Sequence, residues 1–170
     1  MVTLMLVIIP LSVLLGLIST LRPVRGSVKV IALGAAELFL FGTSLVGAAV
    51  GGKIDGALAM TVGILCIAWA MFGGGAVVSA VMVLARRGGL EMPNESLPAS
   101  VWIGVAERAA ITISLTLGLK EMAAVVLGVK ALGQYQGADN HLPAARVLGT
   151  LVSAIWALCC FSVYFVSVRP

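Results

Sequence analysis

Four ionisable residues lie inside long apolar stretches, and at these positions the sequence could support chemistry. They are Glu37, Glu107, Arg108 and Lys130. A charged side chain at the centre of a membrane helix costs roughly 2.5–3.5 kcal/mol on insertion scales, so each one needs a partner or a water-filled cavity. In such settings, carboxylates and basic groups either hold helices together or line a path for protons and ions.

Glu107 and Lys130 are spaced to meet across a helical hairpin. Gly118 interrupts the apolar stretch that contains both, and the two residues are equally far along the chain from the Gly118–Leu119 peptide bond. Because glycine commonly ends a helix, we expect a turn here, with Lys120 and Glu121 at the membrane surface. Glu107 and Lys130 would then lie at similar depth and form an ion pair that fixes the hairpin.

Arg108 needs a different partner, because it follows Glu107 by about 100° around a helix. Three partners are compatible with the sequence: Glu37 on an earlier helix, a lipid phosphate, or another subunit. We expect Glu37, Glu107, Arg108 and Lys130 to form an intramembrane polar network.

The composition indicates an integral membrane protein. Of 170 residues, 61% are hydrophobic and 11% charged, and the mean hydropathy is +1.14. A soluble domain carries about 25% charged residues, so most of this surface must face lipid. The 11 Lys and Arg residues outnumber the 7 Asp and Glu residues, so the net charge is only +4. The longest run of basic residues is the pair Arg86-Arg87. Nucleic-acid binding is therefore not expected.

Apolar stretches of helical length predict an all-α, polytopic transmembrane bundle of about six helices, or five if the short fifth segment is re-entrant. Residues 1–170 form a single integral membrane domain, with three helices in 1–85, a polar loop at 86–98, and a hairpin plus a last helix in 99–170. The predicted helices are 2–20, 28–50, 57–84, 101–117, 121–134 and 144–168.

Small residues predict close helix packing. Glycine accounts for 20 residues, and Gly73, Gly74 and Gly75 predict a kink or a tight crossing within the third helix. Ala124 and Gly128 have the small-xxx-small spacing of packed membrane helices.

Basic residues at the helix ends favour a topology with both termini outside. Alternating six helices puts six basic residues on one side and three on the other, and the more basic side of a membrane protein is usually cytoplasmic. The first group is Arg22, Arg25, Lys29, Arg86, Arg87 and Arg146, and the second is Lys53, Lys120 and Arg169.

The remaining reactive residue types suggest no catalytic residue, metal or cofactor. Cys66, Cys159 and Cys160 lie in apolar stretches, where a thiol behaves as a small hydrophobe. The single histidine, His141, follows Asp139 in a polar loop, where too few ligands surround it for a metal and no nucleophile is near.

A pattern in the C-terminal third of the chain resembles one found in uncharacterised bacterial integral membrane proteins. It combines Glu107-Arg108, Lys130 and the run Gly149-Thr150-Leu151-Val152-Ser153, in a C-terminal three-helix unit. The resemblance implies a bacterial plasma (inner) membrane location. It also implies that Gly149, Thr150 and Ser153 form a helix-packing motif in the same assembled site as the charges. It implies no activity.

Two functions are compatible with these features, and a third has less support. The first is a subunit or accessory factor of a membrane complex, whose partners are the bilayer and other membrane subunits or further copies of itself. The second is a small homo-oligomeric ion or proton transporter or channel. The third, a lipid-modifying enzyme, would depend on polar-loop residues, namely Arg86, Arg87, Glu91 and Glu95.

Overall fold

The computed structural model describes residues 2–21, 26–90, 98–136 and 143–168. Within these ranges every regular element is an α-helix, and the predicted all-α bundle of six helices is confirmed. The helices are α1 (Val2–Leu21), α2 (Ser27–Val50), α3 (Gly56–Arg87), α4 (Pro98–Thr116), α5 (Lys120–Gln136) and α6 (Pro143–Val168).

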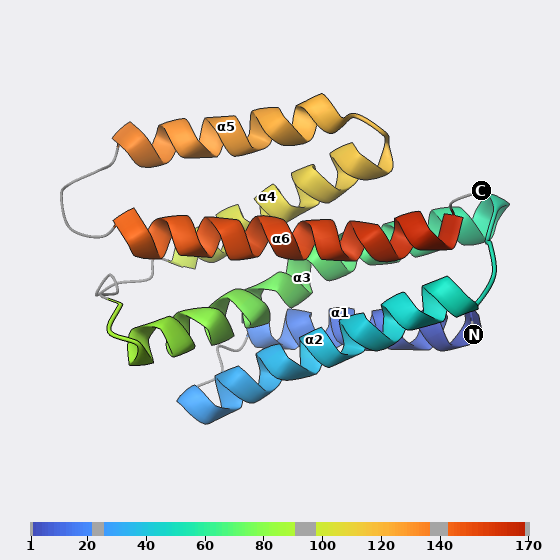
Figure 1. Ribbon diagram of the computed structural model, residues 1–170, viewed down its shortest axis with the longest axis horizontal. Coiled ribbons are helices and arrows are strands. Elements are labelled where there is room, and N and C mark those ends of the chain that lie inside the picture. The colour runs from blue at the N-terminus through green and yellow to red at the C-terminus, as the bar shows by residue number, and fades with distance from the viewer. Residues whose placement is uncertain (1, 22–25, 91–97, 137–142, 169–170) are drawn as a thin grey trace.

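The six helices run roughly along one long axis, and successive helices run in opposite directions (Figure 1). The start of α1, the α2–α3 connection and the end of α6 lie at one end of the bundle. The ends of α3 and α5 and the start of α6 lie at the other. This alternation agrees with the arrangement expected from the sequence, whereas the side of the membrane that each end faces stays a prediction.

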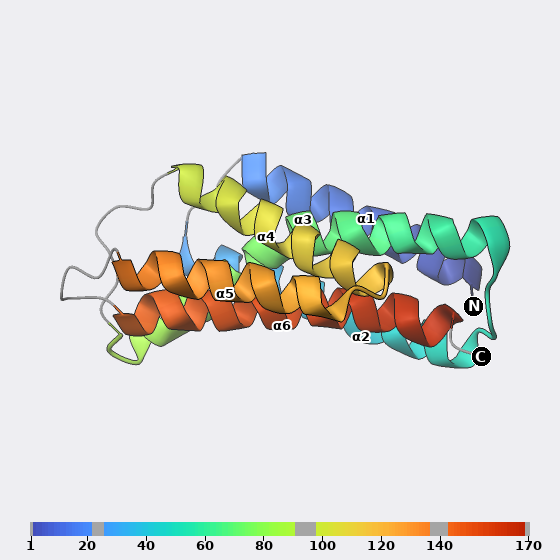
Figure 2. The ribbon, with the colours of Figure 1, turned by 90° about the horizontal axis from the view of Figure 1, so that it is seen from above.

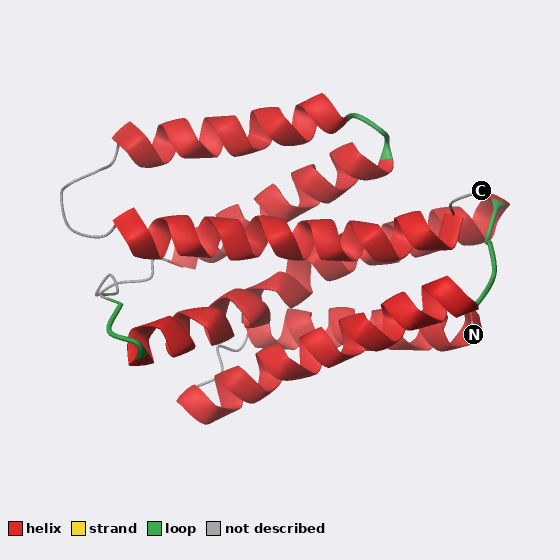
Figure 3. Cartoon of the chain, viewed as in Figure 1, coloured by secondary structure: helices red, strands yellow, loops and turns green. Residues whose placement is uncertain are grey.

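Four helices are long and apolar enough to cross a membrane: α1, α2, α3 and α6. The α4–α5 hairpin is not part of this set. Its turn, a short loop in Figure 3, stops well before the end of the bundle where α3 begins and α6 finishes (Figures 1 and 2). Gly118 occupies this turn with φ +77°, a conformation that glycine adopts without steric cost. The hairpin is therefore a shorter arm attached to a core of four helices.

Helix α3 is the central element, since it packs against α1, α2, α4 and α6. Its 32 residues supply much of the apolar core, including the fully buried Val62, Cys66 and Trp69. From α6, Trp156 and Cys160 join the same cluster. The free thiols of Cys66 and Cys160 are buried among apolar neighbours, and Cys159 is half-buried. All three positions are consistent with small apolar packing groups.

Glycines allow α3 to approach its neighbours at backbone distance. A Cβ placed on Gly16 of α1 would lie 2.6 Å from the Gly73 nitrogen, and one on Gly34 of α2 would lie 2.4 Å from the Ala80 Cβ. Helix α3 stays helical through Gly73–Gly75. The structure therefore shows the tight crossing at this triplet, and α3 also changes direction along its length (Figure 2).

Several residues discussed above lie outside the described ranges, so their predicted roles rest on the sequence alone. They are Arg22, Arg25, Glu91, Glu95, Asp139, His141 and Arg169.

Gly16→Ala should lower the free energy of unfolding by about 1–3 kcal/mol, as overpacking does elsewhere, because the added methyl collides with the α3 backbone. Thermal unfolding in detergent, followed by circular dichroism, measures the change. Gly42→Ala is the matched control, since a Cβ there meets no atom within 4 Å. Equal stability of the two variants would contradict the close α1–α3 crossing.

Candidate functional site: polar groups around the α3 glycines

The predicted ion pair between Glu107 and Lys130 is present. Lys130 Nζ on α5 donates to Glu107 Oε2 on α4, and the two side chains are only 20% and 16% exposed, respectively. Ala123 is buried and Val126 and Lys130 are half-buried, at the three- and four-residue spacing of one helix face. The ion pair therefore joins α5 to α4 at one end of this narrow stripe.

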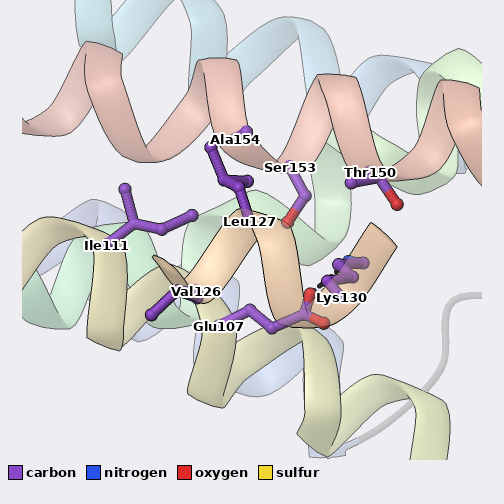
Figure 4. A pocket seen from close by; sticks show the side chains of 8 residues that line it. All are labelled: Glu107, Ile111, Val126, Leu127, Lys130, Thr150, Ser153 and Ala154. Atoms are coloured by element: carbon purple, nitrogen blue, oxygen red, sulfur yellow. Dashed lines mark hydrogen bonds and ion pairs between the residues drawn. The ribbon is translucent and has the colours of Figure 1, made fainter. Parts of the chain in front are cut away.

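A small pocket opens beside the ion pair, where α4, α5 and α6 meet (Figure 4). Its empty volume is about 210 Å³ including the open mouth. The Glu107–Lys130 pair lies on one side of it, and Thr150 and Ser153 of α6 lie on the other. Its lining comprises Glu107, Ile111, Val126, Leu127, Lys130, Thr150, Ser153 and Ala154.

Arg108 extends away from this pair into the protein, where it is only 4% exposed. Its Nε donates to the Ala70 carbonyl at 2.8 Å and Nη2 to the Met71 carbonyl at 2.8 Å, both on α3. Its Nη1 donates to Ser153 Oγ on α6 at 3.2 Å. One guanidinium thus links three helices through charge-assisted hydrogen bonds.

The α3 glycines make this insertion possible. A Cβ on Gly74 would lie 2.5 Å from Arg108 Cδ and 2.6 Å from its Nε, so any larger residue would occupy the path of the side chain. The carbonyls of Ala70 and Met71 sit inside an α-helix, and each oxygen has a second lone pair for an external donor. A helix with glycine at this position therefore presents carbonyls that an arginine from a neighbouring helix can reach.

Glu37 lies on α2, facing the same segment of α3. Its side chain is fully buried, and its Oε2 accepts a hydrogen bond from Trp69 Nε1 at 2.8 Å. Its Oε1 has no hydrogen-bond partner. A Cβ on Gly73 would lie 3.1 Å from Glu37 Oε2, so the glycine leaves room for the carboxyl group. Adjacent glycines of α3 therefore accommodate Glu37 and Arg108.

The four charged residues do not form the single polar network that we expected from the sequence. Glu107 and Lys130 pair with each other, Arg108 uses α3 carbonyls and Ser153, and Glu37 uses Trp69. Arg108 does not pair with Glu37, which was one of its three possible partners. Backbone carbonyls were not considered from the sequence, although the glycine triplet was a signal for them.

Two tryptophans that the sequence did not single out pack in the centre of this region. The rings of Trp69 and Trp156 meet edge to face, with centroids 5.7 Å apart. Phe41 of α2 packs against both, at 6.4 and 6.2 Å. Aromatic pairs in this geometry contribute about 0.5–1.5 kcal/mol beyond their burial. The three rings form an aromatic cluster beside Glu37 and Gly74.

The Gly149, Thr150 and Ser153 motif has mixed roles. A Cβ on Gly149 would lie 2.7 Å from Met82 Cε, so this glycine allows α6 to pack closely on α3. Ser153 accepts from Arg108, whereas the Thr150 hydroxyl donates to the Arg146 carbonyl of its own helix at 3.0 Å. Gly149 and Ser153 therefore take part in packing between helices.

Comparisons with models of known protein families, with curated proteins and with solved structures find no match to this chain. The resemblance described from the sequence stays a prediction. Among the described residues, no group of three His, Cys, Asp or Glu side chains is placed to hold a metal ion.

Arg108→Lys should lower the free energy of unfolding by about 2–3 kcal/mol, because a lysine cannot span two carbonyls and a hydroxyl, and hydrogen bonds to charged groups contribute this much. Ser153→Ala removes one acceptor and should cost less. Denaturant or thermal unfolding in detergent gives both values. A Ser153→Ala loss larger than that of Arg108→Lys would contradict the dominant role of the α3 carbonyls.

Proposed function

We propose that this chain is a subunit or accessory factor of a membrane complex and that α5 is the helix that contacts the partner. The observation that carries this proposal is how little of α5 is covered. From Lys120 to Leu132, only Ala123, Val126 and Lys130 are not exposed. Apart from its packing against α4, α5 makes no extensive helix contact in the described structure.

The uncovered face of α5 has the composition of a helix–helix interface. Ala124, Gly128 and Ala131 recur at four- and three-residue spacing and are all exposed. A Cβ on Gly128 would meet no atom within 4 Å. Small residues at this spacing let a second helix approach at backbone distance, which is the main source of packing energy between helices in a bilayer.

The internal polar groups suit a rigid scaffold. Arg108 and the Glu107–Lys130 pair find their partners within the chain. In some proteins, buried charged groups that are hydrogen-bonded within the chain specify how its helices associate. A fixed core of four helices would then present the hairpin to the partner.

We further propose that the protein lies in the bacterial plasma (inner) membrane, with both termini outside. The resemblance in the C-terminal unit supports the first part. The excess of basic residues at one set of helix ends, such as Arg86 and Arg87 in the last turn of α3, supports the second.

Native mass spectrometry of the tagged protein, extracted gently from its own membrane, tests the proposed association. We expect a stoichiometric foreign subunit with the wild type, and its loss in Gly128→Leu, because the larger side chain blocks close approach to α5. Gly42→Leu is the matched control, since Gly42 also has open space around its Cβ position but lies on α2.

A partner that is retained in Gly128→Leu would show that α5 is not the contact. Absence of any foreign subunit would contradict the proposal as a whole.

The pocket favours a second candidate, a small homo-oligomeric ion or proton transporter. It places a carboxylate, an ammonium group and two hydroxyls around one opening between α4, α5 and α6. Ser153 connects this opening to Arg108. A single chain encloses little space there, so a path would have to be completed by further copies of the chain.

If the transporter candidate is correct, Glu107→Gln should abolish flux in proteoliposomes and leave the protein folded. A pH-sensitive dye inside the vesicles reports proton movement, and size-exclusion elution reports folding. Glu121→Gln, at the exposed start of α5, should keep full flux. A Glu107→Gln variant that fails to assemble would instead indicate a structural role for the ion pair.

A further inference from the structure

Glu37 is a buried carboxyl group that the proposed function does not use. Its side chain has no exposed surface, and one of its two oxygens, Oε1, has no hydrogen-bond partner. The other oxygen accepts a single hydrogen bond, from the Trp69 indole. An ionised carboxylate has about four acceptor sites, so this environment satisfies a small part of what the anion requires.

The helices around Glu37 supply no cation to balance a negative charge. Helix α1 contains no titratable side chain. On α3, Glu37 contacts Trp69 and Gly73, and on α6 it interacts electrostatically with the Cys160 thiol. In the described part of the chain, no Lys or Arg forms an ion pair with Glu37.

Arg108 is a candidate for a counter-charge, but each of its three guanidinium nitrogens already donates to another acceptor. Its three donating nitrogens bind Ala70, Met71 and Ser153, on the side of α3 that Gly74 opens, whereas Glu37 sits against Gly73. Turning the guanidinium toward Glu37 would break these bonds and leave two α3 carbonyls without their external donor.

We infer that Glu37 is a proton-binding site: in the folded protein its carboxyl group is protonated, with the proton on Oε1. Transferring an isolated ionised carboxylate into a low-dielectric interior costs far more than transferring the neutral acid, so a group without a cation takes up a proton instead. The neutral acid keeps Oε2 as the carbonyl oxygen that accepts from Trp69.

Under this assignment, the close packing of α2 against α3 requires Glu37 to stay protonated. Release of the proton would leave an uncompensated charge between two closely packed helices. The proton therefore leaves only if α2 separates from α3 enough for water or a cation to reach Oε1. Gly34 and Gly73 keep the two helices at close approach, which holds the site shut in the described state.

Infrared spectroscopy of the purified protein in a detergent without ester groups tests the assignment. The C=O stretch of a protonated carboxylic acid lies above the amide band. We expect it at about pH 6, well above the ordinary pKa of a glutamate side chain, about 4, so that exposed acids are ionised. The band should shift in D₂O, disappear in Glu37→Gln and remain in Glu121→Gln, whose acid is exposed.

Absence of the band in the wild type, or its persistence in Glu37→Gln, would overturn the inference. Trp69→Phe provides a second test that does not require the Glu37 variant to fold. Loss of the indole donor should move the band to higher wavenumber, because the acid carbonyl loses its one hydrogen bond. An unmoved band would assign the proton to a different acid and would likewise overturn the inference.

Discussion

The insertion of Arg108 into the surface of α3 is the interaction on which the rest of the structure depends. A guanidinium in a membrane bundle must find acceptors, and here it finds two backbone carbonyls and one hydroxyl on two other helices. Since none of these acceptors carries a full charge, the arginine fixes the relative position of α3, α4 and α6 without a carboxylate partner. The direction of α4, and with it the position of the whole hairpin, follows from this contact.

The glycines of α3 are the condition for that insertion. Gly73 faces Gly16 and Glu37, and Gly74 faces Arg108 and Trp156, so two adjacent positions without side chains accommodate residues of four neighbouring helices. A glycine in a helix lowers its intrinsic stability by about 1 kcal/mol relative to alanine in water. The close contacts with α1, α2, α4 and α6 offset that loss, because each brings backbone or polar groups within bonding or dispersion distance.

Helix α5 is attached by fewer contacts than the four helices of the core. The four apolar helices pack together in the core, whereas α5 is held in place by a narrow stripe of residues that ends in the Glu107–Lys130 ion pair. Holding α5 by this stripe and one partly covered ion pair leaves most of the α5 surface exposed. This is the physical reason that we assign association to α5 and proton binding to the interior around Glu37. The two proposals are independent, since the first concerns the exposed face of α5 and the second concerns the packed contact between α2 and α3.

The sequence by itself determined the six helices, their alternation and the Glu107–Lys130 pair, because hydropathy, glycine breaks and equal spacing from a turn are local properties of the chain. It also marked the Gly73–Gly75 crossing. It could not show that Arg108 donates to backbone carbonyls rather than to Glu37, or that Trp69 and Trp156 pack beside Glu37 and Gly74. Those outcomes depend on which faces of α2, α3, α4 and α6 meet. Only the tertiary structure decides that, because every residue carries a backbone carbonyl and packing determines which of them a side chain from another helix reaches.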